Sequence, residues 1–346
     1  MSLQKQFKKF DKKIYLTKQC EAYKDARAKE HSILEDIRKQ FIEEGYPVVK
    51  NYRQGSFKTD TAIVSLKGDF DVDRAIIIQK DKAPDNSVEC KEVIYNILKK
   101  RGFINHTIKT PCVTADYASL NLHIDYAVFQ VDDFENYDIA LGKLTSKEEN
   151  KQWKYSETKQ LIDWINGNDN PIGFSNLTNE EKLQFKRLVR YMKRWRDYNF
   201  SEANRPYIYS IGLTTMIKDC FHPSVDVDGK ENDLESLIST IEYILDHKGY
   251  FIDMGSDQYD VKVYVPFEPR VDIFRKHGKT QGTVFRSKLV TLLKKLKKAN
   301  EEEDLKKQCE ILQGVFGDDF EIDEESNSNE KVVNPVPGIV VPSQGA

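Results

Sequence analysis

The chain has 346 residues, 39% of them hydrophobic and 32% charged, and its formal net charge is −3. This length suits one large two-lobed unit or two modest domains, with an ample core in either case. The near-neutral charge excludes a protein coated in basic side chains, so any anion-binding site must come from local clustering.

Secreted and membrane-spanning proteins are not expected. The N-terminal stretch MSLQKQFKKFDKK is polar and basic and lacks the apolar segment of a signal peptide. No stretch approaches the roughly 18 apolar residues of a membrane-spanning helix. The five cysteines are scattered and form no CxxC pair, which favours reduced thiols. We therefore expect a cytoplasmic protein without a membrane partner.

The first 140 residues alternate between helical and strand-like patterns. A helix is expected over 18–44, because its apolar residues recur at helical spacing and Gly45 and Pro47 follow. Short strands are expected at 48–49, 70–79 and 122–129, with a helix at 88–101 between the last two. Strands interleaved with helices indicate a layered structure of both types.

From about residue 157 the pattern becomes helical. Amphipathic helices are expected at 181–196, 210–221, 233–247 and 284–299. The last segment, 317–346, is first acidic and polar and then rich in Val, Pro and Gly, which is typical of a flexible tail.

Three aspartates recur at every second position just before an aliphatic run, in the stretch QGSFKTDTAIVSLKGDFDVDRAIII at 54–78. Alternate side chains of a strand point to the same face, so Asp71 and Asp73 project together while Val72 points to the other side. Carboxylates this close disfavour each other's ionisation unless a cation lies between them. Mg²⁺ prefers oxygen ligands and is usually held by a few carboxylates and substrate phosphates. Taken alone, such a pair is more often a solvated strand end than a metal site.

A third carboxylate occurs in the later stretch LHIDYAVF. Asp125 lies there on the face opposite to the apolar residues, and an acidic side chain inside a buried strand is costly without a partner. If this strand pairs beside the first, Asp125 completes a cluster of three carboxylates. His123 shares the face, but we expect it to be a hydrogen-bonded neighbour, since Mg²⁺ prefers oxygen.

Gly55 and Ser56 precede the aspartates and form a turn entering a short helix. Backbone N–H groups and a hydroxyl at such a turn are suited to phosphate. Two Mg²⁺ ions (or Mn²⁺) on three carboxylates can clamp a nucleoside triphosphate and activate an attacking hydroxyl. The combination predicts nucleotidyl transfer, in which a hydroxyl attacks the α-phosphate and pyrophosphate leaves.

The GS…DxD…D pattern resembles the nucleotidyltransferase superfamily. More narrowly, the chain resembles the bacterial CD-NTases, which are relatives of animal cyclic GMP–AMP synthase and oligoadenylate synthase. The resemblance covers most of residues 1–317 and includes the segments QGS, FDVD, HID, LVRYMKRW, YSIGLT, VDIFRK and VFGDDF. It implies synthesis of cyclic di- or trinucleotides from ATP, GTP or other nucleoside triphosphates, as second messengers in anti-phage (CBASS) defence.

The resemblance also implies a two-lobed α+β fold of the polymerase-β type. Residues 1–156 would be a catalytic lobe with a mixed sheet and an N-terminal spine helix. Residues 157–316 would be a helical lobe closing the nucleotide cleft, and 317–346 the tail.

Site residues follow from the same resemblance. Gln54, Gly55 and Ser56 would bind the triphosphate, and the catalytic, metal-binding residues would be Asp71, Asp73 and Asp125, the last also helping to activate the hydroxyl. Asp69 and Asp71 have the same spacing as Asp71 and Asp73 and are an alternative pair. Phe70, an apolar residue before the first aspartate, favours Asp71 and Asp73. Arg74 departs from the aliphatic residue of many relatives, and its parity points away from the metals.

The helical lobe contributes further candidates. In relatives a lysine and a serine touch the nucleotide phosphates, and Lys193 and Ser210 match them best. Lys193 lies with Lys186 and Arg190 on one flank of the helix at 181–196, for which a solvated surface is the alternative. Tyr207 and Tyr209 could stack on a base, although core packing is the alternative for at least one of them.

Other functions stay open at this stage. A related enzyme could use another acceptor, giving linear oligoadenylate, tailed RNA or a modified small molecule or protein, and a non-catalytic nucleotide-binding protein is a further alternative. Nucleic-acid binding by the lysine-rich segment 284–299 is not expected, because its period fits an ordinary amphipathic helix. The C-terminal Gln344-Gly345-Ala346 could be recognised by a regulatory or conjugating protein, as in some CD-NTases.

Overall fold

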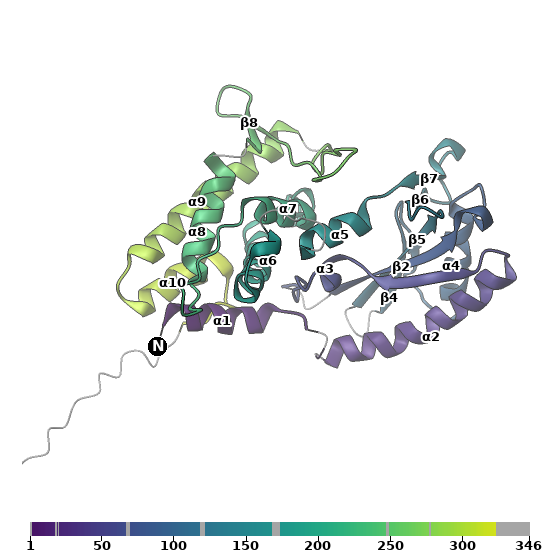
Figure 1. The fold of residues 1–346 in the computed structure, drawn as a ribbon, viewed down its shortest axis with the longest axis horizontal. Coiled ribbons are helices and arrows are strands. Elements are labelled where there is room, and N and C mark those ends of the chain that lie inside the picture. The colour runs from purple at the N-terminus through teal and green to yellow at the C-terminus, as the bar shows by residue number, and fades with distance from the viewer. Residues whose placement is uncertain are drawn as a thin grey trace, which may run out of the picture.

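Two lobes make up the computed structural model, which describes residues 2–17, 19, 21–66, 70–117, 122–167, 174–246, 249–276 and 278–322. One lobe holds a seven-stranded sheet and the other holds most of the helices, with α3 and α5 between them (Figure 1). The expected α+β class and two-lobed fold are therefore confirmed. The division at residues 156 and 316 stays a prediction.

The sheet has the order β1-β2-β5-β4-β3, with β6 paired to β5 and β7 paired to β6. The bounds are β1 Val48–Arg53, β2 Phe70–Gln79, β3 Thr107–Ile108, β4 Val113–Tyr117, β5 Leu122–Val131, β6 Tyr137–Leu141 and β7 Gln152–Tyr155. Strands β2 and β5 are parallel and the other pairs are antiparallel, so the sheet is mixed. The two strands with the aspartates are thus central neighbours.

Helices α2 (Glu21–Glu43) and α4 (Val88–Lys100) share one apolar core with the sheet. Ile33 and Ile37 of α2 are buried in it, together with Val72 and Ile124 of the central strands. The expected helix over 18–44 therefore exists, and Gly45, with φ of +90°, follows its end. Because a strand alternates its faces, burying Val72 directs Asp71 and Asp73 away from this core.

The helical lobe is built around α6 (Asn179–Asn199). Thr178 and Glu181 form a capping box that starts this helix, and the apolar face predicted for it is buried. The other elements are α5 (Thr158–Asn166), α7 (Ser210–Cys220), α8 (Asp233–Asp246), α9 (Lys279–Glu301), α10 (Leu305–Phe316) and a two-stranded ribbon of β8 (Phe251–Asp253) and β9 (Tyr259–Val261).

Helix α1 (Leu3–Ile14) was not expected from the basic N-terminal stretch. Phe7, Phe10 and Ile14 occur at helical spacing and are buried in the core of the helical lobe. The ring centroids of Phe7 and Phe320 are 5.2 Å apart, so the described ends of the chain meet there. The chain thus starts in the helical lobe and enters the sheet lobe with α2 (Figure 1).

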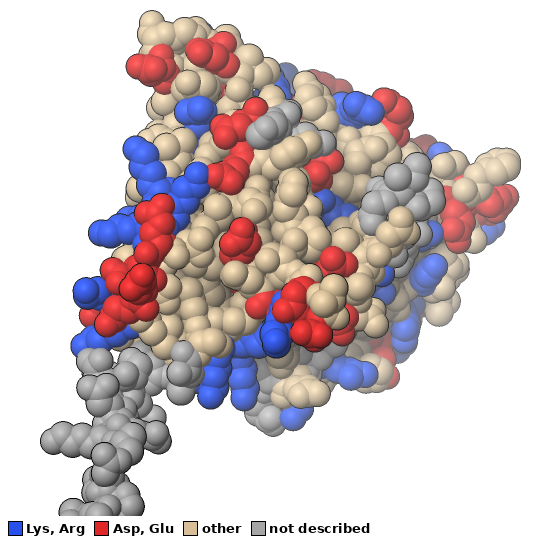
Figure 2. Space-filling model, turned by 60° about the vertical axis from the view of Figure 1, so that its left-hand side comes forward, with Lys and Arg blue, Asp and Glu red and all other residues tan. Residues whose placement is uncertain are grey.

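The surface shown in Figure 2 carries acidic and basic side chains intermixed, in keeping with the small net charge. Within the part of the chain that the structure describes, no helix has the length and apolar character that crossing a membrane requires.

Candidate active site

A cavity of about 520 Å³ brings together the three preferred aspartates, the Gly-Ser turn and the two phosphate-binding candidates of the helical lobe. Its lining includes Gln54, Gly55, Ser56, Asp71, Asp73, Asp125, Lys193 and Ser210. The first six come from the sheet lobe, and the last two from α6 and α7 of the helical lobe. The cavity therefore lies between the lobes.

The three aspartates meet through the parallel pairing of β2 with β5. In this register Asp73 is directly opposite Asp125, and Asp71 is opposite His123. The pKa of Asp73 is raised to about 6, first by burial and then by the negative charges of Asp125 and Asp71, while Lys193 and Lys109 act in the opposite direction. A raised carboxyl pKa means that ionising Asp73 is unfavourable without additional positive charge.

Gly55 lies against Asp73. Its φ is +58°, and a Cβ atom added to it would lie 2.1 Å from Oδ2 of Asp73. The Gln54 N–H donates to the Asp73 carbonyl oxygen at 2.9 Å. A side chain at position 55 would therefore both strain the backbone and displace the carboxylate. The short helix α3 (Gly55–Lys58) begins here and carries Ser56 into the cavity lining.

Asp125 has two polar neighbours that the sequence did not reveal. Thr114 of β4 donates a hydrogen bond to Oδ1 of Asp125, and Nζ of Lys109 lies 3.4 Å from both carboxylate oxygens. Thr114 pairs with Asp125 in the register of β4 and β5, which no spacing in the sequence indicates. Both side chains hold the third carboxylate in a fixed orientation.

Lys91 of α4 binds the turn that carries Lys109. Its buried Nζ donates to the carbonyl oxygens of Lys109 at 3.3 Å, Thr110 at 2.9 Å and Gly142. Burial lowers the pKa of Lys91 to about 8. The ammonium group thus fixes the turn between β3 and β4, from which Lys109 reaches Asp125.

The donor set fits a hard divalent cation, although the carboxylates do not stand in a preformed shell. Among the described residues, no group of three His, Cys, Asp or Glu side chains converges closely enough to hold an ion. The chemistry nevertheless fits, because three carboxylates line one cavity and the pKa of Asp73 is raised by burial and by the other two. The alternative ligand Asp69 lies outside the described residues.

His123 lies near a carboxylate: its Nδ1 is 3.6 Å from Oδ1 of Asp116, which is longer than a hydrogen bond. Its expected role as a hydrogen-bonded neighbour stays a prediction. Arg74 points to the opposite face of the sheet, as expected, and pairs there with Glu30.

The basic flank of α6 holds the two lobes together. Nζ of Lys193 donates to the Thr61 carbonyl oxygen at 2.8 Å, and Arg190 bonds the Asp60 carbonyl oxygen at 2.6 Å and Asp11. The alternative of a solvated flank is therefore wrong for Lys193 and Arg190, which are buried. Burial lowers the pKa of Lys193 to about 7.

Ser210 lies at the start of α7 and accepts a hydrogen bond from Arg196. Tyr209 stacks on Phe274 with ring centroids 5.6 Å apart, so it packs in the core, while Tyr207 is exposed. Contact of Lys193 or Ser210 with a nucleotide stays a prediction.

Part of the cavity wall is apolar, which the sequence did not reveal. Its members are Phe129 and Ile139 from the sheet and Leu161, Ile162 and Ile165 from α5. Such a wall suits the flat face of a nucleobase.

Part of the sheet lobe matches a known protein family. Residues 49–129 match the family described as cyclic GMP-AMP synthase DncV-like, nucleotidyltransferase domain. This segment contains the Gly-Ser turn and all three aspartates of the cavity. A comparison with curated protein sequences finds no match.

Solved structures share the whole architecture. Vibrio cholerae DncV cyclic AMP-GMP synthase is 17% identical, with a TM-score of 0.68 over 91% of this chain and 96% of that one. Escherichia coli DncV bound to 3'-deoxy GTP is 14% identical, with a TM-score of 0.66 over 89% and 93% of the two chains. The Bradyrhizobium diazoefficiens CD-NTase CdnG in complex with GTP is 17% identical, with a TM-score of 0.64 over 91% and 95%.

Proposed function

We propose that this chain is a nucleotidyltransferase of the CD-NTase family and that it joins nucleoside triphosphates into a cyclic di- or trinucleotide with release of pyrophosphate. The observation that carries the proposal is the direct pairing of Asp73 with Asp125 beside the Gly55-Ser56 turn, in one cavity between the lobes. The printed descriptions of similar structures support it. The Vibrio cholerae enzyme is described as a cyclic AMP-GMP synthase and was solved with the linear intermediate 5' pppA(3',5')pG.

The proposed reaction depends on metal ions. Here Asp71, Asp73 and Asp125 would hold two Mg²⁺ ions, with Mn²⁺ as a substitute. When bound, the ions supply a Lewis acid that activates the attacking hydroxyl and neutralises charge on the pyrophosphate.

The chain's own residues provide binding and orientation. The Gln54-Gly55-Ser56 turn would bind the triphosphate next to Asp73, and the apolar wall of α5 would contact a base. Thr114 and Lys109 hold Asp125 so that its carboxylate faces the same cavity. Lys193 bonds Thr61 beside the turn and would bring the helical lobe close to the phosphates.

Two alternatives concern the acceptor and the chemistry itself. An enzyme with the same site could extend a linear oligoadenylate, tail RNA or modify a small molecule or protein. A non-catalytic nucleotide-binding protein is disfavoured, because the turn and all three carboxylates line the cavity.

The anti-phage role, the cytoplasmic location and recognition of the C-terminus by a conjugating protein are parts of the proposal. The tail residues 323–346 lie outside the described residues.

Product analysis tests the proposal. The purified chain would be incubated with an equimolar mixture of the four ribonucleoside triphosphates and Mg²⁺, treated with phosphatase and examined by mass spectrometry. A phosphatase-resistant cyclic di- or trinucleotide is expected. Linear ladders, or turnover that requires an added acceptor, would favour the alternative enzymes instead.

A further inference from the structure

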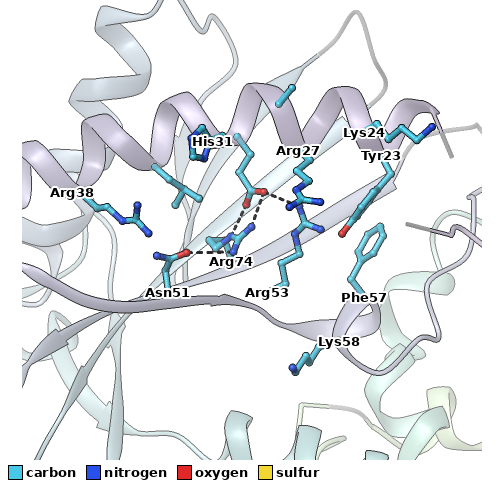
Figure 3. Close-up of a pocket in the computed structure, with 13 residues that line it drawn as sticks. Tyr23, Lys24, Arg27, His31, Arg38, Asn51, Arg53, Phe57, Lys58 and Arg74 are labelled. Atoms are coloured by element: carbon cyan, nitrogen blue, oxygen red, sulfur yellow. Dashed lines mark hydrogen bonds and ion pairs between the residues drawn. The ribbon is translucent and has the colours of Figure 1, made fainter. Parts of the chain in front are cut away.

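A second groove lies on the other side of the strands that carry the candidate catalytic residues. It has a volume of about 950 Å³ and runs between α2 and the segment formed by β1 and α3 (Figure 3). Basic side chains dominate its lining: Lys24, Arg27, His31, Arg38, Arg53, Lys58 and Arg74. Glu30 is the single acidic residue among the described residues of this lining, and its side chain is only 2% exposed.

Glu30 binds two arginines from two different strands. Its Oε1 accepts from Nε of Arg74 at 2.6 Å, and its Oε2 accepts from Nη2 of Arg74 at 2.7 Å. The same Oε2 accepts from Nη2 of Arg53 at 3.1 Å. Figure 3 shows these contacts as dashed lines, with Asn51 bonded to the far side of Arg74. One carboxylate on α2 therefore joins the end of β1 to β2.

The two arginines are adjacent in sequence to the candidate catalytic residues. Arg53 directly precedes the Gln54-Gly55-Ser56 turn, and Arg74 directly follows Asp73. The arginines are themselves cross-strand partners in the pairing of β1 with β2. A displacement of either one would be transmitted through a single peptide unit to the turn or to the carboxylate.

The catalytic side tolerates little displacement. Gly55 is so close to Asp73 that even a methyl group would overlap its carboxylate, and the Gln54 N–H is bonded to the Asp73 backbone. Without Glu30, the guanidinium groups of Arg53 and Arg74 would lie near each other without a carboxylate between them. Their like charges would then repel each other. The repulsion would act to separate the ends of β1 and β2, on which the turn and Asp73 are carried.

We propose that Glu30 is a positioning residue for nucleotidyl transfer, which through Arg53 and Arg74 fixes the separation between the triphosphate-binding turn and the metal-binding Asp73. The inference rests on the proposed function, since it gives the turn and Asp73 their roles. It assigns to α2 a part in the geometry of the active site in addition to its packing on the sheet.

A matched control variant distinguishes positioning of the active site by Glu30 from a purely structural role in the packing of α2. Ile37 of α2 is fully buried in the apolar core between α2 and the sheet and is not among the residues that line the groove. Ile37→Val would therefore weaken the packing of α2 without changing the charges. Glu30→Gln removes the charge at nearly constant shape, and Glu30→Asp keeps the charge on a shorter side chain.

The measurements are nucleotide affinity and rate on the full chain. Titration with a non-hydrolysable ATP analogue and Mg²⁺ should give a Kd raised at least about tenfold in Glu30→Gln, with a smaller rise in Glu30→Asp. The magnesium concentration for half-maximal rate should rise in the same order. Ile37→Val should keep the wild-type Kd even where its melting temperature falls as far as that of Glu30→Gln.

Unchanged affinity in Glu30→Gln would overturn the inference, and so would an equal loss of affinity in Ile37→Val. Should Glu30→Gln fail to fold, Glu30→Asp against Ile37→Val at matched stability decides the question. A wild-type chain that binds the analogue but makes no product would overturn the proposed function alone, because the affinity comparison does not need turnover.

Discussion

Asp73 and Asp125 are directly opposite each other in the parallel pairing of β2 with β5. The two carboxylates come from segments that are about fifty residues apart in the chain, and the sheet makes them neighbours. Each is supported by groups of another element, Asp73 by the Gly55 turn and Asp125 by Thr114 and Lys109. Substitutions in any of these supporting elements are therefore expected to displace one of the two carboxylates.

Removal of the carboxylates should abolish synthesis. For Asp71→Ala with Asp73→Ala we expect product formation to fall by at least about a hundredfold, since losing metal-ion stabilisation of the transition state costs several kcal/mol. Far-UV circular dichroism should remain that of the wild type, because Val72 and the apolar face of β2 are unchanged. Full activity in this double variant would contradict the assignment.

The raised pKa of Asp73 predicts a pH dependence of stability without metal. A carboxyl group with a pKa of about 6 in the folded chain and 3.8 as its ordinary value binds its proton more tightly when folded. Its contribution to the free energy of unfolding is thus complete below pH 4 and is lost as the pH rises through 6. The pKa difference corresponds to an effect on the order of 3 kcal/mol.

Chemical denaturation between pH 4 and 7 with a chelator checks this expectation. The difference between the wild type and Asp73→Asn isolates the Asp73 contribution from those of other carboxylates. Saturating Mg²⁺ should oppose the loss, because the cation binds the ionised form. A difference that stays constant across this pH range would argue against a perturbed Asp73.

Gly55→Ala should damage activity more than stability alone explains. The new Cβ would lie 2.1 Å from the Asp73 carboxylate, and the backbone φ is +58°. Gly45→Ala is the matched control, since its φ is +90° but nothing lies within 4 Å of the added Cβ. Both should lose about 1–2 kcal/mol of stability from the positive φ. Only Gly55→Ala should also lose nucleotide affinity, and equal affinities in titrations of the two variants would be evidence against a role of this close approach.

Lys91→Met should loosen the turn that carries Lys109. The substitution leaves the carbonyl oxygens of Lys109, Thr110 and Gly142 without their buried donor, which should lower the free energy of unfolding by about 2–3 kcal/mol. The exposed Lys99→Met on the same helix is the control and should lie within about 0.5 kcal/mol of the wild type. Urea denaturation of both variants measures the difference, and similar midpoints would count against the supporting role of Lys91.

The local sequence was sufficient for the elements and for the chemical type of the site. Strand parity separated Val72 from Asp71 and Asp73, and the position of an acid in LHIDYAVF indicated that Asp125 shared their face. The helix at 88–101 and the apolar face of α6 were predicted because helical spacing of apolar residues reflects burial directly. Helix α1 was missed, because its few apolar residues stand among lysines and only the core of the distant helical lobe buries them.

Residue type and a period of two are sufficient to place three carboxylates on the polar faces of two strands, downstream of a Gly-Ser turn. Which strands are neighbours depends on the packing of the whole lobe, and so does the register that sets Asp125 between Asp73 on one side and Thr114 on the other. The same packing brings Lys193 to Thr61 and joins Arg53 to Arg74 through Glu30. Such contacts depend on the packing of segments far apart in the chain, and no local spacing encodes them.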